Sequence, residues 1–184
     1  RIEQRSSRRV VVRQHAAVVE KWQRDQRPAE QPAVEQHCRE HADERPATFV
    51  FLGDYIDRGP ESAGVVAYLI EMQSSPGERC IALMGNHEAF ALGVMEGTTD
   101  ADHWLSQGGA ETLLSYGVAS AGDLPRQHVE WMRALPLTYD DGRRFFVHAG
   151  VDPSRPLDAQ DDHDLLWIRE PFLDSTEPFG KIVV

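Results

Sequence analysis

Short apolar runs that stop at a glycine, alternating with helix-like segments, constrain the fold of this chain more than any other feature of its sequence. One run covers residues 48–52 and stops at Gly53, and a second covers residues 80–84 and stops at Gly85. Residues 60–73 lie between them and carry apolar side chains at helical spacing after a proline in the first turn. Strands that alternate with helices predict an α/β fold, classed as α+β in some schemes, in which helices cover a sheet.

The second half of the chain continues this alternation. Apolar spacing predicts helices over residues 88–95, 101–116 and 125–135. Residues 137–139 and 144–147 flank the sequence Asp140-Asp141-Gly142, which predicts a β-hairpin with a glycine in its turn. The chain finishes on the strand-like residues 182–184.

The first 46 residues differ in composition from the rest. They hold ten Lys and Arg against eight Asp and Glu, whereas residues 47–184 hold nine against twenty-two. Apart from Val10-Val11-Val12 and a candidate helix over residues 34–43, no apolar spacing is sustained there. We therefore divide the chain into an atypical, poorly patterned N-terminal segment, residues 1–46, and a domain over residues 47–184. We expect most of the first segment to be poorly ordered or weakly helical.

Charge and composition exclude several classes of function. The formal net charge of −11 argues against binding a nucleic-acid backbone and favours metal cations as ligands. No apolar run approaches the roughly 18 residues of a membrane span, and no signal peptide is visible. Two cysteines without a CxxC pair indicate neither a disulfide framework nor a zinc site. We expect a cytoplasmic protein without membrane or nucleic-acid partners.

Three polar clusters follow predicted strands. They are residues 53–59, which read GDYIDRG, residues 85–88, which read GNHE, and residues 148–150, which read HAG. Each alone is explained by ordinary turn chemistry, but together they offer oxygen and nitrogen donors suited to Mn²⁺, Fe²⁺ or Zn²⁺. Arg58 adds a planar guanidinium that can hold two phosphate oxygens. The combination indicates phosphoryl chemistry.

The same clusters carry a family resemblance. Residues 51–61 (FLGDYIDRGPE), 85–88 (GNHE) and 148–150 (HAG) resemble the calcineurin-like metallophosphoesterases. They are most similar to the phosphoprotein phosphatase branch of serine/threonine phosphatases and its bacterial relatives. The resemblance implies a βαββ-type sandwich flanked by helices around two divalent metal ions, Mn²⁺ first and Fe or Zn as alternatives. It also implies in-line attack on phosphorus by a metal-activated hydroxide, with a phosphorylated protein or a small phosphoester as substrate.

The resemblance implies three metal ligands in this chain. Asp54 would bridge both ions, and Asn86 and His148 would bind the second ion. Physical chemistry agrees with the first assignment, because a ligand shared by two dications has to be anionic to offset their charge.

The resemblance also implies an acid and a phosphate clamp. His87 would protonate the leaving alkoxide and Asp57 would hold that imidazole, since a general acid works best with a pKa near neutrality. Arg58 would bind the phosphate. Arg169 would be a second phosphate contact, or equally a surface arginine paired with Glu170.

The chain also departs from the family pattern. The GDxHG motif that normally supplies the ligands of the first metal is missing, and the early residues His15, His37 and His41 lack a preceding Gly-Asp and an apolar strand. The late GHT motif is missing too. We therefore expect an incomplete sandwich that lacks a central strand, with a weakly held metal pair or none. Our hypothesis is a truncated or frame-disturbed phosphatase, in which residues 1 to about 38 replace the first βα unit and the resemblance covers residues 39–184.

Three functions stay open at this point. The motifs favour a serine/threonine protein phosphatase, because the diadenosine-polyphosphate hydrolases, a sister group, often depart from the pattern at the positions of Asp57 and Glu88. That sister group is the alternative enzyme. The third interpretation is a catalytically impaired fragment or binding domain that keeps the fold.

Overall fold

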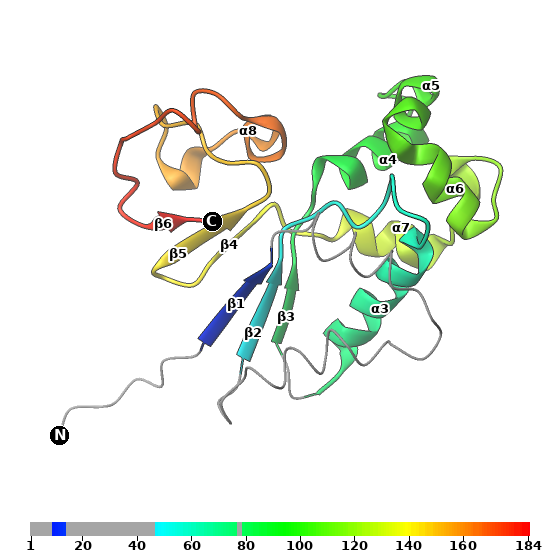
Figure 1. Ribbon diagram of the computed structural model, residues 1–184, viewed down its shortest axis with the longest axis horizontal. Helices are drawn as coiled ribbons and strands as arrows, with labels where there is room; N and C mark the ends of the chain where they lie inside the picture. The colour runs from blue at the N-terminus through cyan, green and yellow to red at the C-terminus, as the bar shows by residue number, and fades with distance from the viewer. Residues whose placement is uncertain (1–8, 14–46, 77–78) are drawn as a thin grey trace.

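The computed structural model describes residues 9–13, 47–76 and 79–184, with the backbone alone for residues 9–13. Figure 1 shows two neighbouring sheets. Most of the helices lie on the far side of the first sheet, and α8 lies on the far side of the second. Within the described residues each sheet has three strands.

The first sheet is parallel and has the order β1-β2-β3. Its strands are β1 (Arg9–Arg13), β2 (Ala47–Phe51) and β3 (Arg79–Ala82). Helix α3 (Ser62–Ser74) connects β2 to β3, as a parallel pair requires. The apolar run of β2 is buried almost throughout, because the sheet is covered on both faces.

Strand β1 corrects one expectation from the sequence. The strand before β2 was expected to be missing, but β1 pairs with β2 along its whole length, with Val11 opposite Phe49. Three consecutive valines have strong strand propensity, and the neighbouring strand supplies the pairing that the flanking sequence did not reveal. β1 ends two residues before His15, so an apolar strand does lead toward an early histidine. The candidate helix over residues 34–43 lies outside the described residues.

The second sheet has the order β4-β5-β6. Strands β4 (Thr138–Asp140) and β5 (Arg144–Val147) form the predicted antiparallel hairpin, and β6 (Ile182–Val183) pairs in parallel with β5. In the turn, the Asp141 carboxylate accepts the backbone N–H groups of Arg143 and Arg144 at 2.9 and 2.7 Å. The hairpin and the terminal strand predicted from the sequence are both confirmed.

Three apolar clusters hold the layers together. Val50 and Leu52 from the first sheet meet Phe146 from the second in a core between the sheets. A larger core joins the first sheet to the helices, and a third lies on the outer side of the second sheet around Leu165. This layering is the β-sandwich flanked by helices that the sequence predicted.

The remaining helices mostly agree with the predicted positions. Their bounds are α4 (Asn86–Glu96), α5 (Ala101–Trp104), α6 (Ala110–Tyr116), α7 (Arg126–Arg133) and α8 (Asp162–Trp167), with 3₁₀ turns η2 (Ala121–Asp123) and η3 (Leu157–Ala159). The single helix predicted over residues 101–116 is wrong. A kinked turn, η1 (Leu105–Gly109), interrupts it, because Gly108 there has the non-helical φ of 116°. In the described part of the chain, no helix has the length and apolar character needed to cross a membrane.

Candidate active site

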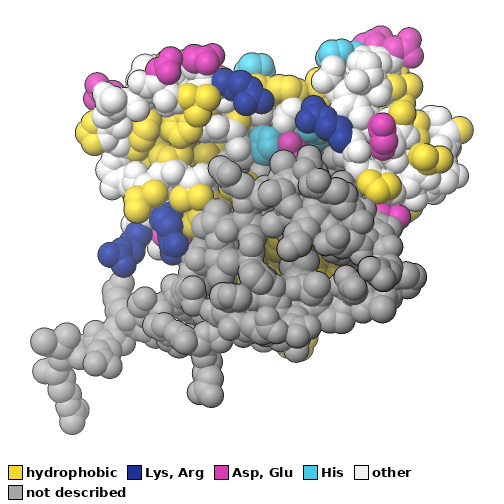
Figure 2. Space-filling model, in the orientation of Figure 1, with side chains coloured by type: hydrophobic (Ala, Val, Ile, Leu, Met, Phe, Trp, Pro, Cys, Tyr) yellow, Lys and Arg dark blue, Asp and Glu magenta, His cyan; other side chains and the backbone are white. Residues whose placement is uncertain are grey.

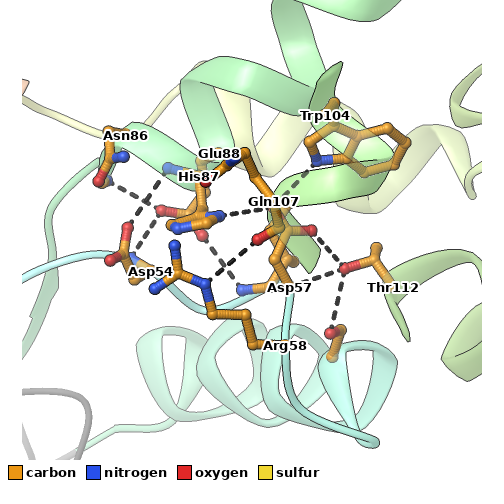
Figure 3. Close-up of polar contacts among 12 residues, drawn as sticks. Asp54, Asp57, Arg58, Asn86, His87, Glu88, Trp104, Gln107 and Thr112 are labelled. Atoms are coloured by element: carbon orange, nitrogen blue, oxygen red, sulfur yellow. Dashed lines mark hydrogen bonds and ion pairs between the residues drawn. The ribbon is translucent and has the colours of Figure 1, made fainter. Parts of the chain in front are cut away.

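The three predicted polar clusters meet at one place in the structure, and Figure 3 shows residues of the first two. The loop after β2 contacts the start of α4, because the Asp54 carboxylate accepts the backbone N–H of His87 at 3.3 Å. This approach requires Gly85, where an added Cβ would lie 2.3 Å from the Asp54 nitrogen and 2.4 Å from its Oδ1. The loop after β5 joins them through His148. Strand ends from both sheets therefore build a single site.

The imidazole of His148 faces oxygen atoms at both of its nitrogens. Nδ1 lies 2.6 Å from the carbonyl oxygen of Leu52, which can only accept, so Nδ1 carries a proton. Nε2 lies 2.8 Å from Asn86 Oδ1 and 3.5 Å from Asp54 Oδ1. In the neutral imidazole, Nε2 therefore turns a lone pair toward two oxygen atoms.

Three electron-pair donors that converge in this way fit a divalent cation. A carboxylate, an amide oxygen and an imidazole nitrogen suit Mn²⁺, Fe²⁺ or Zn²⁺, and the hydrogen bond from Nδ1 to a backbone carbonyl orients the imidazole for binding. The described residues contain no group of three His, Cys, Asp or Glu placed to hold a metal ion. The set Asp54, Asn86 and His148 has two such residues and an amide, so it is a partial site for one ion.

A buried acid–base pair lies beside this donor set. His87 Nδ1 is 2.7 Å from Asp57 Oδ2, and the side chains are 4% and 0% exposed. Burial on its own lowers the pKa of His87, but the hydrogen bond to Asp57 and the charges of Asp54 and Asp57 outweigh it, so the pKa lies above its ordinary value. Because Nδ1 is occupied by Asp57, Nε2 is the nitrogen of His87 that can exchange a proton with another molecule.

Arg58 follows Asp57 and is exposed. Its Nε donates to the carbonyl of Gln107 at 3.2 Å, and its backbone N–H donates to the carbonyl of Gly108 at 3.1 Å. In Figure 3 the guanidinium points to the same side as Asp54 and His87. An arginine held at this position can bind an anionic oxygen close to both groups.

The loop that carries these residues has a strained backbone. Asp54, Asp57 and Arg58 have φ values of 59°, 72° and 59°, in the left-handed region that residues with a Cβ rarely adopt. Such strain persists only where the surrounding structure over-determines it, and it clusters at functional sites.

Glu88 supplies much of that surrounding structure. Its buried carboxylate accepts four backbone N–H groups: those of Tyr55 and Ile56 on Oε1, at 2.6 and 3.2 Å, and those of Asp54 and Gly85 on Oε2, at 2.8 and 2.9 Å. Burial, and then the charge of Asp54, raise the pKa of Glu88 to about 7, while the N–H donors act in the opposite direction. Because every one of the four donors needs an acceptor lone pair, the arrangement serves the carboxylate form.

The structure brings together six of the seven residues that the sequence singled out. The exception is Arg169, an exposed residue beyond the end of α8, whose backbone carbonyl accepts the N–H of Leu173. Neither its contact with phosphate nor the alternative pairing with Glu170 is among the described contacts, and its role stays a prediction.

Sequence reasoning missed three residues that support the site: Glu88, Trp104 and Thr112. Glu88 lay inside a recognised motif, and an acidic residue at the third position of a helix was a signal that it caps the helix start. Trp104 and Thr112 donate to Asp57 from a segment about 50 residues away in the chain, and nothing in their local sequence indicated this.

The surface around the site is not uniformly acidic. Figure 2 shows Lys or Arg side chains close to histidines, between the part of the molecule that contains the second sheet and α8 and the part that contains α4 to α6. A protein with a net charge of −11 can therefore present a local cationic site, which a phosphate group requires.

Comparison with known proteins shows which family and which relatives this chain resembles. The family model described as calcineurin-like phosphoesterase matches residues 15–184. The symmetrical bis(5'-nucleosyl)-tetraphosphatase of Bordetella pertussis is 33% identical over 113 residues, which are 61% of this chain and 36% of the relative. The protein of the same name from Nitrosospira multiformis is 33% identical over 103 residues, which are 56% of this chain and 33% of the relative. The chain thus spans about a third of the length of these relatives.

Two solved structures have a similar fold. One, assigned as a diadenosine tetraphosphatase, has a TM-score of 0.52 at 23% identity and covers 74% of this chain and 52% of its own. The other, a protein serine/threonine phosphatase from Saccharomyces cerevisiae, has a TM-score of 0.50 at 19% identity and covers 86% of this chain and 47% of its own. At these identities the likeness shows the fold alone.

Proposed function

Because the chain belongs to the calcineurin-like phosphoesterase family, we propose that its site hydrolyses phosphate esters or anhydrides with the help of a divalent metal ion. One observation carries the proposal. The metal-ligand set Asp54, Asn86 and His148 lies beside a buried His87–Asp57 pair and an exposed Arg58. These are the groups needed to hold a cation, a proton and a phosphate next to one another.

Each side chain has a separate task in this proposal. Asp54, Asn86 and His148 would hold a divalent ion, and such an ion would supply polarisation of the phosphate and activation of water. Arg58 holds the anionic oxygens of the substrate, and its bonds to the carbonyls of Gln107 and Gly108 limit where the guanidinium can go. His87 gives a proton from Nε2 to the departing oxygen, while Asp57 keeps the ring oriented and stabilises its charged form.

The family generally uses two divalent ions, and the described residues supply a partial set for one of them. We propose Mn²⁺ as the first ion to test, with Fe and Zn as alternatives, because one carboxylate, one amide and one imidazole make a mixed oxygen and nitrogen set.

We propose a dinucleoside polyphosphate as the first substrate class. The curated relatives, at 33% identity, are named symmetrical bis(5'-nucleosyl)-tetraphosphatases. Aromatic rings near the acid support this choice: the Phe90 ring is edge-on to His87 with centroids 6.5 Å apart, and Trp167 lies 4.9 Å from Phe90. The nucleobase of a leaving nucleotide next to His87 would find rings to contact.

Phosphoserine or phosphothreonine in a protein is the second substrate class. It is favoured by the resemblance of the GDYIDRG and GNHE segments to the protein phosphatase branch, including Asp57 and Glu88. The two classes are separated by comparing kcat/KM of the full chain for diadenosine tetraphosphate and for a phosphothreonine peptide. A larger value for the dinucleotide supports the first class, and a larger value for the peptide reverses the order.

The activity itself is tested with p-nitrophenyl phosphate and the full chain, with and without added Mn²⁺. We expect Mn²⁺-dependent turnover that Asp54→Asn abolishes, because this change removes the anionic ligand. Asp158→Asn, which neutralises an exposed carboxylate in η3, is the matched control and should retain turnover. A folded chain without turnover would instead support a binding domain that keeps the fold, and equal turnover in wild type and Asp54→Asn would place the chemistry elsewhere.

A further inference from the structure

The carboxylate of Asp57 is held by more than His87. Trp104 Nε1 donates to Asp57 Oδ2 at 2.9 Å, the same oxygen that bonds His87. Thr112 Oγ1 donates to Asp57 Oδ1 at 2.7 Å. Trp104 and Thr112 are both buried, so their bonds to Asp57 are shielded from water. A donor left without its acceptor costs the most free energy in such a buried place.

Thr112 fixes the backbone of Asp57 as well as its side chain. Its Oγ1 accepts the Asp57 backbone N–H at 2.8 Å while donating to Asp57 Oδ1. Since the single hydroxyl proton is used on the carboxylate, Ser62 is the donor in the 3.3 Å contact between the two hydroxyls. The reciprocal pair holds Asp57 in its left-handed conformation, with φ 72°.

The same segment also holds the phosphate-binding arginine. The carbonyls of Gln107 and Gly108 accept the Nε and the backbone N–H of Arg58, as described above. Gly108 has φ 116°, and a Cβ added there would lie 2.6 Å from both the nitrogen and the Cγ of Arg58. The contact between the two backbones therefore depends on glycine at this position.

A kink at Gly108, between α5 and α6, explains how one segment reaches both neighbours. In an uninterrupted α-helix, residues eight apart point about 80° away from each other. The turn η1 lies between Trp104 and Thr112 and changes this relation, so that both side chains reach Asp57.

We propose that residues 104–112 form a positioning element that fixes the His87–Asp57 acid pair and Arg58 as one unit. Trp104 and Thr112 are positioning residues that act through Asp57, and Gly108 acts through Arg58. This inference rests on the proposed function, because it uses the roles assigned there to His87 and Arg58.

If residues 104–112 act as a positioning element, substitutions at different positions within it should cause two different kinetic defects. Trp104→Phe and Thr112→Val remove one donor each with little change in shape, so His87 should become a poorer acid. That defect should appear with phenyl phosphate, whose leaving group needs a proton, and much less with p-nitrophenyl phosphate. We expect kcat for phenyl phosphate to fall about tenfold to a hundredfold, a partial loss of the roughly 10²–10⁴-fold that a general acid contributes.

Gly108→Ala should act on substrate binding instead. By displacing Arg58 it should raise KM about tenfold for both aryl phosphates with little effect on kcat, and weaken binding of inorganic phosphate by a similar factor. A merely structural role would not divide the effects in this way between kcat and KM.

Two control variants accompany these measurements. Thr112→Ser keeps the hydroxyl and should restore turnover of phenyl phosphate toward the wild-type value. Trp131→Phe removes a different indole hydrogen bond, the one from Nε1 to Gln73 Oε1 at 2.7 Å in a partly exposed position, and should leave both substrates unaffected.

Proton NMR tests the acid pair without turnover. We expect a low-field resonance from the His87 Nδ1 proton, absent in His87→Gln, that is shifted or broadened in Trp104→Phe and Thr112→Val but unchanged in Trp131→Phe. Equal losses of turnover for both aryl phosphates, or a resonance that Trp104→Phe and Thr112→Val leave unchanged, would overturn the inference. A wild type without turnover would overturn the proposed function, and the resonance would still decide the positioning of the acid pair.

Discussion

At the residue scale, one buried side chain does the most to set the shape of the site. Glu88 belongs to α4, yet its carboxylate accepts backbone N–H groups from Asp54, Tyr55 and Ile56 in the loop after β2. The loop contains three non-glycine residues with positive φ, a conformation that such residues rarely adopt on their own. The carboxylate therefore stabilises a backbone conformation in which Asp54 can serve as a ligand.

Glu88→Gln should destabilise the chain. The amide retains one oxygen, and its NH₂ group would face two backbone N–H donors and leave them unsatisfied. We expect the free energy of unfolding, measured in urea, to fall by about 3 kcal/mol, because bonds to charged groups are worth roughly 1.5–3 kcal/mol each. Glu71→Gln, on the exposed surface of α3, is the control and should change stability little. Equal stabilities of the two variants would contradict the assigned role.

The half-buried His128 gives a prediction about pH. Its Nδ1 lies 2.9 Å from the hydroxyl of Tyr116, and burial lowers its pKa. The unfolded chain then binds a proton here at higher pH than the folded chain. The stabilising contribution is therefore complete above the ordinary histidine pKa of about 6.5 and is lost as the pH falls toward the folded value.

The free energy of unfolding of wild type minus that of His128→Gln should accordingly decrease between about pH 7.5 and pH 5.5, although Glu88 and His87, whose pKa values are raised, act in the opposite direction in both proteins. Other groups titrate in both proteins, so the difference between the two curves isolates His128. Parallel curves across this range would show that the site does not disfavour the charged imidazole.

At the scale of the element, the interrupted helix shows how far local patterns reach. Apolar spacing predicted one helix over residues 101–116, but the structure has α5, η1 and α6 in its place. Two consecutive glycines, Gly108 and Gly109, weaken the helix locally. Contacts with Arg58 and Trp104 then decide which non-helical conformation forms there.

The start of α5 depends on a side-chain cap. Asp100 accepts the backbone N–H of His103 at 2.8 Å. Asp100→Ala should lower the free energy of unfolding by about 1 kcal/mol, as for other helix caps. Asp100→Asn keeps an acceptor and should cost only a few tenths of a kcal/mol. Urea unfolding of both variants checks this, and an equal loss in both would indicate that the charge, rather than the cap, matters.

At the scale of the whole molecule, the sandwich brings the site together. The loop after β2 and the start of α4 come from the first sheet, whereas His148 follows β5 in the second. The core between the sheets, with Val50 and Leu52 opposite Phe146, sets their separation. Packing between the sheets is therefore a condition for His148 to reach Asn86 and Asp54.

Phe146→Ala should be among the most damaging core substitutions. The ring is 0% exposed, and its loss would leave a cavity between the sheets, so we expect the free energy of unfolding to fall by about 3–5 kcal/mol. Leu114→Ala is the matched control, since Leu114 is 81% exposed and should change stability by no more than about 0.5 kcal/mol. Thermal or urea unfolding of both variants tests this, and a loss below about 1 kcal/mol in Phe146→Ala would show that the sheets are not tightly packed there.

Local sequence patterns were enough to predict the strands β2 and β3, the β4–β5 hairpin, and the residues that could carry chemistry. These features depend on local patterns: apolar runs ended by glycine, a turn rich in aspartate, and polar residues at strand ends. The local patterns of residues 1–46 were too weak to predict a strand there. Strand β1 was identified only from its pairing with β2.

Which of those residues meet, and which contacts hold them, depends on the three-dimensional fold. His148 is separated from Asn86 by 62 residues, and Trp104 from Asp57 by 47, so no local spacing relates them. The four N–H groups on Glu88 and the hydroxyl of Thr112 on Asp57 are likewise contacts between distant segments. Hydrogen bonds and packing between segments that are far apart in the chain form only in the folded molecule. The chemical groups could therefore be predicted from the sequence, whereas their contacts could be found only in the folded structure.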